Sequence, residues 1–319
     1  MATPKRKFRS GIIHHCYQNT KDGFLIFYSV TDYLVHFTLL CVKAEQYGIS
    51  VPIICQMPDH THGSFITDSL ESLSAFMRDT ASLYSRFGQA PQCRGGQLFN
   101  RRYGCAVKIG DKKARTNIVY IGNNPVERHL VEKAEDYRWN YLAYAKSDHP
   151  FSQKLVISKA SKPLLMAIGE VKSAHNRRQY LSYNFIQRLF APLNPSEKHQ
   201  LIDYIVTTYS VIDYEYASRF FDGYDEMIGA MHFNTGSEYD LNEVFTGRSD
   251  ACYSKISTLL MNRLRLSDIH QVFELSEAQR ADLSLDVYRQ TGIGMRQIAK
   301  YLRLKVSLSQ NGDYQRDTV

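Results

Sequence analysis

Apolar residues in the first half of the chain recur with two different spacings, one helical and one extended. Between Val30 and Tyr47 they return every three or four positions, which predicts a helix. Residues 12–17 predict a short strand. Residues 51–57 are a compact apolar run that breaks at Pro58-Asp59 and resumes over residues 61–66, which predicts two further strands. The start of the chain is therefore a mixture of strands and helices.

The same pattern continues towards residue 150. Residues 69–87 have the helical spacing again, with Ser69 or Ser72 available as the N-cap. Residues 95–108 begin with two glycines and predict a hairpin. Residues 112–123 predict a further helix, which we expect Pro125 to stop.

The second half is mostly helical and follows a polar connector over residues 146–163. Near its end, Ser276 and Gln279 have the spacing of a capping box and open a predicted helix that runs to about Thr291. Gly292 and Gly294 make the turn to a second short helix over residues 295–302. Its inward face is predicted to consist of three residues, namely Ile298, Ala299 and Leu302.

This order of elements predicts the α+β class, with a sandwich of sheet and helices first and a helical region after it. We expect two domains, residues 1–150 and residues 151–319, with a helix-turn-helix-like end over residues 275–310. The length of 319 residues is enough for two domains of ordinary size.

Composition narrows the class of protein only moderately. Hydrophobic residues make up 44% and charged residues 22% of the chain, as in ordinary globular proteins. The formal net charge is +7, which suits an acidic partner. The six cysteines form no C-x-x-C pair and indicate a reducing, cytoplasmic location. The apolar run from residue 24 to residue 42 contains Asp32 and His36, so we expect a buried helix and no membrane span.

Residues 57–62 are the most informative stretch. On a strand, His60 and His62 point to the same face because side chains alternate. Two adjacent imidazoles can hold one divalent metal, although a bare pair of histidines is more often structural.

A second motif lies at residues 120–126. Tyr120 and Asn124 are four positions apart and share a face if this segment is helical. They would then present a hydroxyl and an amide oxygen to one point. Taken alone, Tyr120 could equally be a packed helix tyrosine, and Asn124 with Pro125 could be a helix stop.

Together the two motifs resemble those of HUH single-tyrosine transposases, in particular the REP-associated tyrosine transposases. That branch has a Pro-x-His-x-His element followed by a Tyr-Ile-x-x-Asn-Pro-Val element, and this chain has both, at residues 58–62 and 120–126. The aromatic segment 136–141 resembles the family's closing segment. Two departures are Thr61, where the family has a bulky apolar residue, and the long C-terminal half.

The resemblance implies an HUH-type sandwich with a central antiparallel sheet and flanking helices. It also implies a transposase or endonuclease that cleaves and rejoins single-stranded or hairpin DNA through a 5′-phosphotyrosine. Tyr120 would be the nucleophile, and His60, His62 and Asn124 would hold Mg²⁺ or Mn²⁺, which polarises the phosphate. All of this chemistry falls within residues 1–150.

Between the two motifs, basic and aromatic residues are interleaved. Cations contact phosphates and aromatic rings stack on unpaired bases, so this combination suits single-stranded DNA. A solvated charged hairpin is the alternative interpretation. The predicted DNA-binding residues are Arg94, Phe99, Arg101, Arg102, Tyr103, Lys108, Lys112, Lys113 and Arg115.

The C-terminal end adds duplex DNA as a candidate partner. A recognition helix would begin near residues 305–307, but Asn311-Gly312 interrupts it. The acidic segment 201–250 predicts a solvated helical region. We expect a monomer or homodimer, located in the cytoplasm with the nucleoid. Two other functions stay open, a DNA-binding regulator of repeat hairpins that has lost transposition and a rolling-circle replication initiator.

Overall fold

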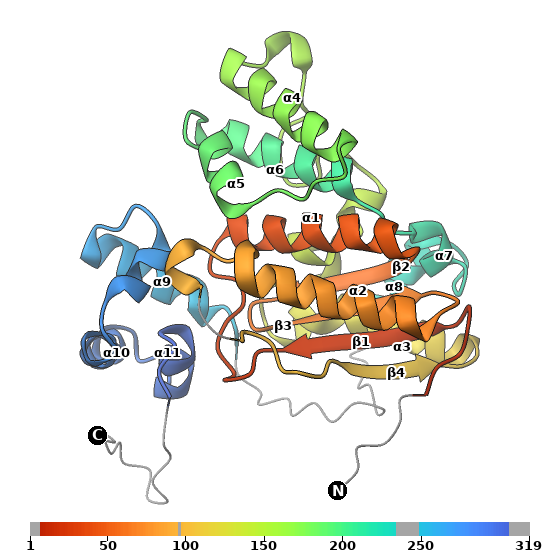
Figure 1. Ribbon diagram of the computed structural model, residues 1–319, viewed down its shortest axis with the longest axis horizontal. Coiled ribbons are helices and arrows are strands. Elements are labelled where there is room, and N and C mark those ends of the chain that lie inside the picture. Colours follow the sequence, from red (N-terminus) through yellow and green to blue (C-terminus); the bar gives the residue numbers. More distant parts are fainter. Residues whose placement is uncertain (1–6, 95–96, 234–248, 306–319) are drawn as a thin grey trace, which may run out of the picture.

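The computed structural model describes residues 7–94, 97–233 and 249–305. Its first half contains one four-stranded antiparallel sheet with helices on both faces, and its second half is mostly helical, so the predicted α+β class is confirmed (Figure 1). The strands are β1 (Ile13–Asn19), β2 (Ser50–Met57), β3 (His60–Ile66) and β4 (Gly104–Lys108).

The sheet order is β2-β3-β1-β4, which places β3 between two partners. His62 on β3 is opposite Tyr17 on β1 and Cys55 on β2. Pro58 and Asp59 form the turn between β2 and β3, as predicted. The carbonyl of Pro58 accepts hydrogen bonds from the N–H groups of Ile26 and Phe27, at 2.8 and 3.1 Å. These bonds fix the position at which β3 begins.

Three helices belong to the sheet. They are α1 (Val30–Tyr47), α2 (Leu70–Leu83) and α3 (Asp111–Glu127). On β3, Phe65 contacts Phe76 of α2, whereas His62 contacts Tyr120 of α3. Because neighbouring strand residues point to opposite faces, α2 and α3 lie on opposite faces of the sheet. The histidines are therefore enclosed between β3 and α3.

Two predictions about this half are wrong. Residues 97–108 do not form a hairpin: β4 pairs with the edge of β1, and Phe99 makes an isolated bridge to Thr20. The backbone N–H and C=O groups of β4 form their hydrogen bonds with the edge of β1, so the segment does not have to pair with itself in a hairpin. Pro125 does not stop α3, which continues to Glu127. Proline removes a single N–H near the end of the helix, so the final turn still forms.

The next helices extend the core from the first half. They are α4 (Lys162–Asn176), α5 (Tyr183–Phe190), α6 (Pro195–Tyr209), α7 (Tyr214–Ser218) and α8 (Tyr224–Phe233). One cluster of buried apolar residues runs from Cys16 to Met231. The hydroxyl of Tyr144 donates to the buried carboxylate of Asp203 at 2.7 Å. The core is thus continuous across residue 150, and the division into two domains there stays a prediction.

A separate helical unit ends the described chain. It contains α9 (Cys252–Leu264), a 3₁₀ segment (Ile269–Glu274), α10 (Glu277–Thr291) and α11 (Met295–Tyr301), and it lies beside one end of the sheet (Figure 1). Its apolar cluster also includes Leu25 from the loop before α1.

The predicted details of this unit are mostly confirmed. The capping box of Ser276 and Gln279 forms, and Gly292 adopts the left-handed conformation at the turn. Ile298, Ala299 and Leu302 are buried, as predicted. The recognition helix expected near residues 305–307 falls almost entirely on residues 306–319, outside the described part of the chain. In the described ranges, no helix is both long and apolar enough to cross a membrane.

Candidate active site

The structure brings together the four residues for which the sequence predicts the chemistry. His60 and His62 are buried on the same face of β3, and their ring centroids are 4.8 Å apart. Tyr120 and Asn124 face them from α3. The rings of Tyr120 and His62 are 5.6 Å apart, and Asn124 Oδ1 is 3.5 Å from His60 Nε2. Asn124 Nδ2 donates to the carbonyl of Tyr120 at 3.2 Å, which directs the amide oxygen towards His60.

The donor set is suited to a divalent metal. His60 Nδ1 is 2.5 Å from the carboxylate of Asp59, and His62 Nδ1 is 3.0 Å from His15 Nε2. Metal-binding histidines commonly have one ring nitrogen held in this way, so that the other nitrogen is oriented for the ion. Each ring would therefore bind through Nε2, with the amide oxygen of Asn124 as a third ligand. In the described chain, no three His, Cys, Asp or Glu side chains form a metal cluster.

The sequence did not identify the residues that support His62. Asn117, three positions before Tyr120, has its amide nitrogen 2.8 Å from His15 Nδ1, and its amide oxygen accepts from Ser64 Oγ at 2.7 Å. All of these side chains are buried. Burial, together with the charges of His62 and Lys108, lowers the pKa of His15 well below 6.5. His15 is therefore neutral at pH 7. Its position in the strand-like run 12–17, on the same face as Tyr17, was the available signal.

His60 is supported from the other end of the chain. The ammonium group of Lys300 on α11 contacts the second oxygen of Asp59, 241 positions away in sequence. Although burial opposes ionisation, the charges of His60 and Lys300 hold the pKa of Asp59 well below its usual range. No local pattern could have predicted this contact.

Asp250 is a second acidic residue at this end of the site. It is buried just before α9, and its N–H donates to the carbonyl of Arg128 at 3.0 Å. Burial and the charge of Asp59 raise the pKa of Asp250 to about 6. The C-terminal half therefore contributes ionisable groups around His60, which the sequence analysis did not predict.

The predicted DNA-binding residues are divided between surface and core. Phe99 packs between His36 and Tyr84 at 2% exposure, and Lys108 is also 2% exposed, so neither lies on the predicted surface. The bridge from Phe99 to Thr20 draws its segment onto the sheet. Tyr103 is half-buried, with its hydroxyl 3.4 Å from Ser74 Oγ.

Arg94 is exposed, but its guanidinium donates to the carbonyls of Phe87 and Gln89 at 3.0 Å each. The guanidinium of Arg115 lies over the ring of Phe221, 4.7 Å from its centre. The exposed members of the predicted set are Arg94, Arg101, Arg102, Lys112, Lys113 and Arg115.

Comparison with known proteins gives a distant likeness in fold. One matching structure is that of the REP-associated tyrosine transposase bound to a REP hairpin, with 14% sequence identity and a TM-score of 0.38. The match covers 50% of this chain and 96% of that chain. No family model matches the sequence, and no curated protein matches it. This likeness concerns the fold of half of the chain, and the chemistry has to be argued from the chain's own residues.

Proposed function

We propose that this protein is a metal-dependent tyrosine endonuclease and strand transferase of the HUH type, acting on single-stranded or hairpin DNA. One observation carries the proposal: Tyr120, His60, His62 and Asn124 meet across the interface between β3 and α3. The two histidines are more than 50 residues from Tyr120 in sequence, and packing of the sheet against the helix brings them together. A buried tyrosine beside two oriented imidazoles and an amide oxygen is the set of groups that this reaction needs.

In the reaction, the hydroxyl oxygen of Tyr120 attacks a backbone phosphorus. The Tyr–O–P bond forms, the bond from phosphorus to the 3′ oxygen breaks, and the 3′ oxygen takes up a proton. The tyrosine proton must leave as well, since a tyrosine hydroxyl with a pKa near 10 is a weak nucleophile. Mg²⁺ or Mn²⁺ held by His60, His62 and Asn124 would polarise the phosphate. The products are a 5′-phosphotyrosine and a free 3′ hydroxyl, and attack by a 3′ hydroxyl on the phosphotyrosine rejoins the strand.

The surrounding residues act as positioning groups. The pair of Asp59 and Lys300 holds the ring of His60, and the pair of His15 and Asn117 holds the ring of His62. Both imidazoles are therefore fixed before any substrate arrives, which removes an entropic cost from the reaction.

One observation favours a different function. Tyr120 is only 6% exposed, so the strand has to reach a largely covered ring. A protein that binds DNA hairpins for regulation, without cleaving them, needs no such access. The helix-turn-helix-like pair α10 and α11 is compatible with that function as well.

Hairpin DNA labelled at the 3′ end or at the 5′ end can distinguish the endonuclease from the regulatory DNA-binding protein. A 5′-phosphotyrosine retains the downstream fragment, so a library of single-stranded hairpins labelled at the 3′ end, incubated with Mn²⁺, should give a labelled protein band that survives denaturation. The same library labelled at the 5′ end should release a free fragment. Tyr120→Phe should abolish the band, whereas Tyr103→Phe should retain it. Binding without any adduct under these conditions would support the regulatory function.

A further inference from the structure

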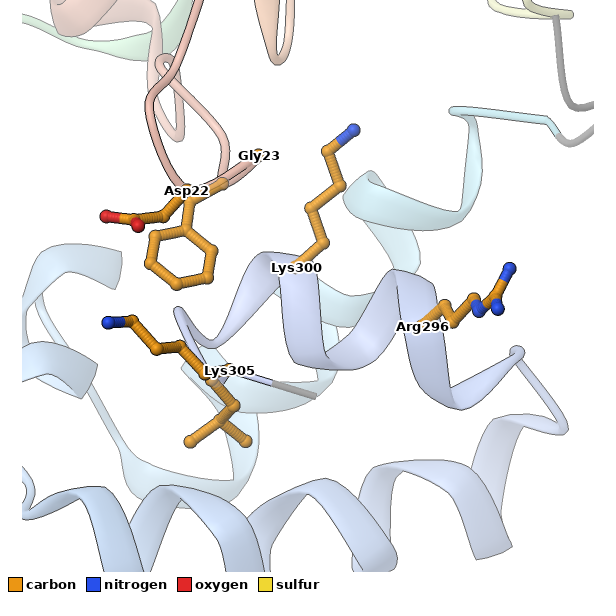
Figure 2. A pocket seen from close by; sticks show the side chains of 7 residues that line it. Asp22, Gly23, Arg296, Lys300 and Lys305 are labelled. Atoms are coloured by element: carbon orange, nitrogen blue, oxygen red, sulfur yellow. The ribbon is translucent and has the colours of Figure 1, made fainter. Parts of the chain in front are cut away.

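A cationic groove lies between α11 and the loop that precedes α1. Its volume is about 390 Å³, and it is lined by Arg296, Lys300 and Lys305 on one side and by Asp22 and Phe24 on the other. Figure 2 shows the three cations projecting from α11 and the residues just after it, with Asp22 and Gly23 on the facing loop. Apart from the residues of this loop, all residues that line the groove come from beyond residue 150.

The charge of the groove is available to a ligand. Arg296 and Lys305 are exposed, and neither forms an ion pair with another described residue. Lys300 is shared with Asp59, so the uncompensated charge of the groove comes from Arg296 and Lys305, opposed by Asp22. Exposed cations held around a hollow attract anions, and phosphodiesters in particular.

The groove also has an apolar part. Phe24 is half-buried, and with Leu304 it lines the hollow beside the cations. Gly23 next to it has a φ of 73°, and no atom lies within 4 Å of the position that a Cβ would take, so the loop leaves the hollow open there. A phenylalanine ring can stack on an unpaired base while cations contact the adjoining phosphates. This combination suits a single strand better than a duplex, whose bases are already stacked.

The groove is directly connected to the candidate active site. Lys300 lines the groove and contacts Asp59, and Asp59 contacts His60. A strand in the groove therefore lies two side-chain contacts from a proposed metal-binding residue. The exposed residues of the predicted DNA-binding set do not include any residue of this groove.

We propose that the cationic groove binds the phosphodiester backbone of single-stranded nucleic acid next to the active site, with Phe24 stacking on a base. That the bound strand is also the cleaved strand rests on the proposed function, but binding itself does not. The C-terminal unit would thus contact the unpaired strand close to the site of cleavage.

The test measures binding of the full chain to a fluorescent single-stranded oligonucleotide, and to the matching duplex, over a range of salt concentrations. The variants are Arg296→Gln, Lys305→Gln, their double variant and Phe24→Leu, which keeps apolar packing and removes the flat ring. Arg289→Gln on α10 and Lys255→Gln on α9 are matched controls, because both residues are exposed on the same helical unit and do not line the groove.

Each single charge variant should weaken single-strand binding about threefold to tenfold, and the double variant should lower the slope of log affinity against log salt by about 1.4. Phe24→Leu should weaken binding about fivefold or more without changing the slope. The controls should bind like the parent, and polyglutamate should compete poorly with the oligonucleotide. Equal losses in the control variants, equal losses for the duplex, or full competition by polyglutamate would each overturn the proposal.

The two proposals fail separately. If no Tyr120 adduct forms but the groove variants lose single-strand affinity, the endonuclease proposal is wrong and the groove stands. If the adduct forms and the groove variants bind and cleave like the parent, the groove is wrong and the endonuclease proposal stands.

Discussion

Lys300, in the last helix of the described chain, forms an ion pair with Asp59 in the turn before β3. The other carboxylate oxygen of Asp59 is 2.5 Å from His60 Nδ1, so one acid links α11 to the candidate metal site. The carboxylate is largely buried and needs a positive partner. The orientation of His60 therefore depends on a helix that sequence analysis assigned to a separate region.

Removing this partner should weaken the metal site. We expect Lys300→Ala to raise the concentration of Mn²⁺ needed for half-maximal cleavage by about 10-fold to 100-fold, as is typical when a group behind a metal ligand is lost. Lys300→Arg should retain much of the parent's affinity for Mn²⁺ because it keeps the charge. Calorimetric titration with Mn²⁺, in the absence of DNA, measures the same affinity independently of cleavage. An unchanged metal requirement in Lys300→Ala would show that the contact serves stability alone.

The stability of the protein should fall at alkaline pH because of His270. Its Nε2 is 2.9 Å from the carboxylate of Asp32, and its Nδ1 is 2.6 Å from that of Asp268. Burial alone would lower the pKa of His270, but the charges of Asp32 and Asp268 outweigh it and raise the pKa from 6.5 to about 9. The ionised form is thus favoured in the folded state, and its contribution is complete below pH 6.5 and is lost as the pH rises through 9.

Urea unfolding at pH 6.5 and pH 9.5 measures this contribution. The parent should lose up to about 3 kcal/mol of unfolding free energy between these values. His270→Gln should be less stable than the parent at pH 6.5 and should change less between the two. A parallel decline in parent and variant would assign the pH dependence to other groups.

Gly104 on β4 should not tolerate a side chain. A Cβ there would lie 1.9 Å from the ring of Tyr17, the residue opposite it on β1. Displacing this ring disturbs the face that holds His62, whose ring centroid is 6.2 Å from that of Tyr17. Gly104→Ala should therefore cost about 1–3 kcal/mol of stability, the usual cost of overpacking. In a Tyr17→Leu background the same change should cost clearly less, because the two sites are in contact. Equal costs in both backgrounds, in thermal or urea unfolding, would contradict the steric explanation.

A fragment of residues 1–150 should not fold by itself, although the sequence placed all of the chemistry there. Nearly the whole length of α1 is buried, and residues of α4, α5 and α6 belong to the same core cluster. Tyr144 would also lose its acceptor, Asp203. We expect rapid proteolysis and poor dispersion of amide signals, compared with the full chain under the same conditions. A well-folded fragment would show that the helices after residue 150 form an independent layer.

Much of this fold could be predicted because the signals are local. The helical spacing from Val30 to Tyr47 and the Pro58-Asp59 break define α1, β2 and β3 closely. Alternation on β3 was sufficient to place His60 and His62 on one face, and the spacing of four on α3 did the same for Tyr120 and Asn124. That these two faces form one site was implied only by the family resemblance.

The sequence-based predictions are wrong or incomplete where tertiary contacts determine the position of a residue. From the sequence, Phe99 resembles an exposed aromatic residue among cations, but its bridge to Thr20, just after β1, places its ring in the core. The contact of Lys300 with Asp59 depends on how the C-terminal unit docks on the loop before α1, and a pattern along the chain contains no information on that docking.

The hydrogen bonds that join Asn117, His15 and His62 have a direction. As placed, the amide nitrogen of Asn117 donates to His15 Nδ1, so neutral His15 carries its hydrogen on Nε2 and donates to His62 Nδ1. A neutral His62 then has its own hydrogen on Nε2, the atom through which it would bind an ion. Ligation by that atom requires every hydrogen bond to run in the opposite direction. His62 Nδ1 would then donate to His15 Nε2, and His15 Nδ1 would donate to the amide oxygen of Asn117. The amide of Asn117 would have to flip, so that its nitrogen faces Ser64. The buried amide of Asn117 would thus change its orientation if an ion bound His62, and its ¹⁵N signal should then shift when Mg²⁺ is added.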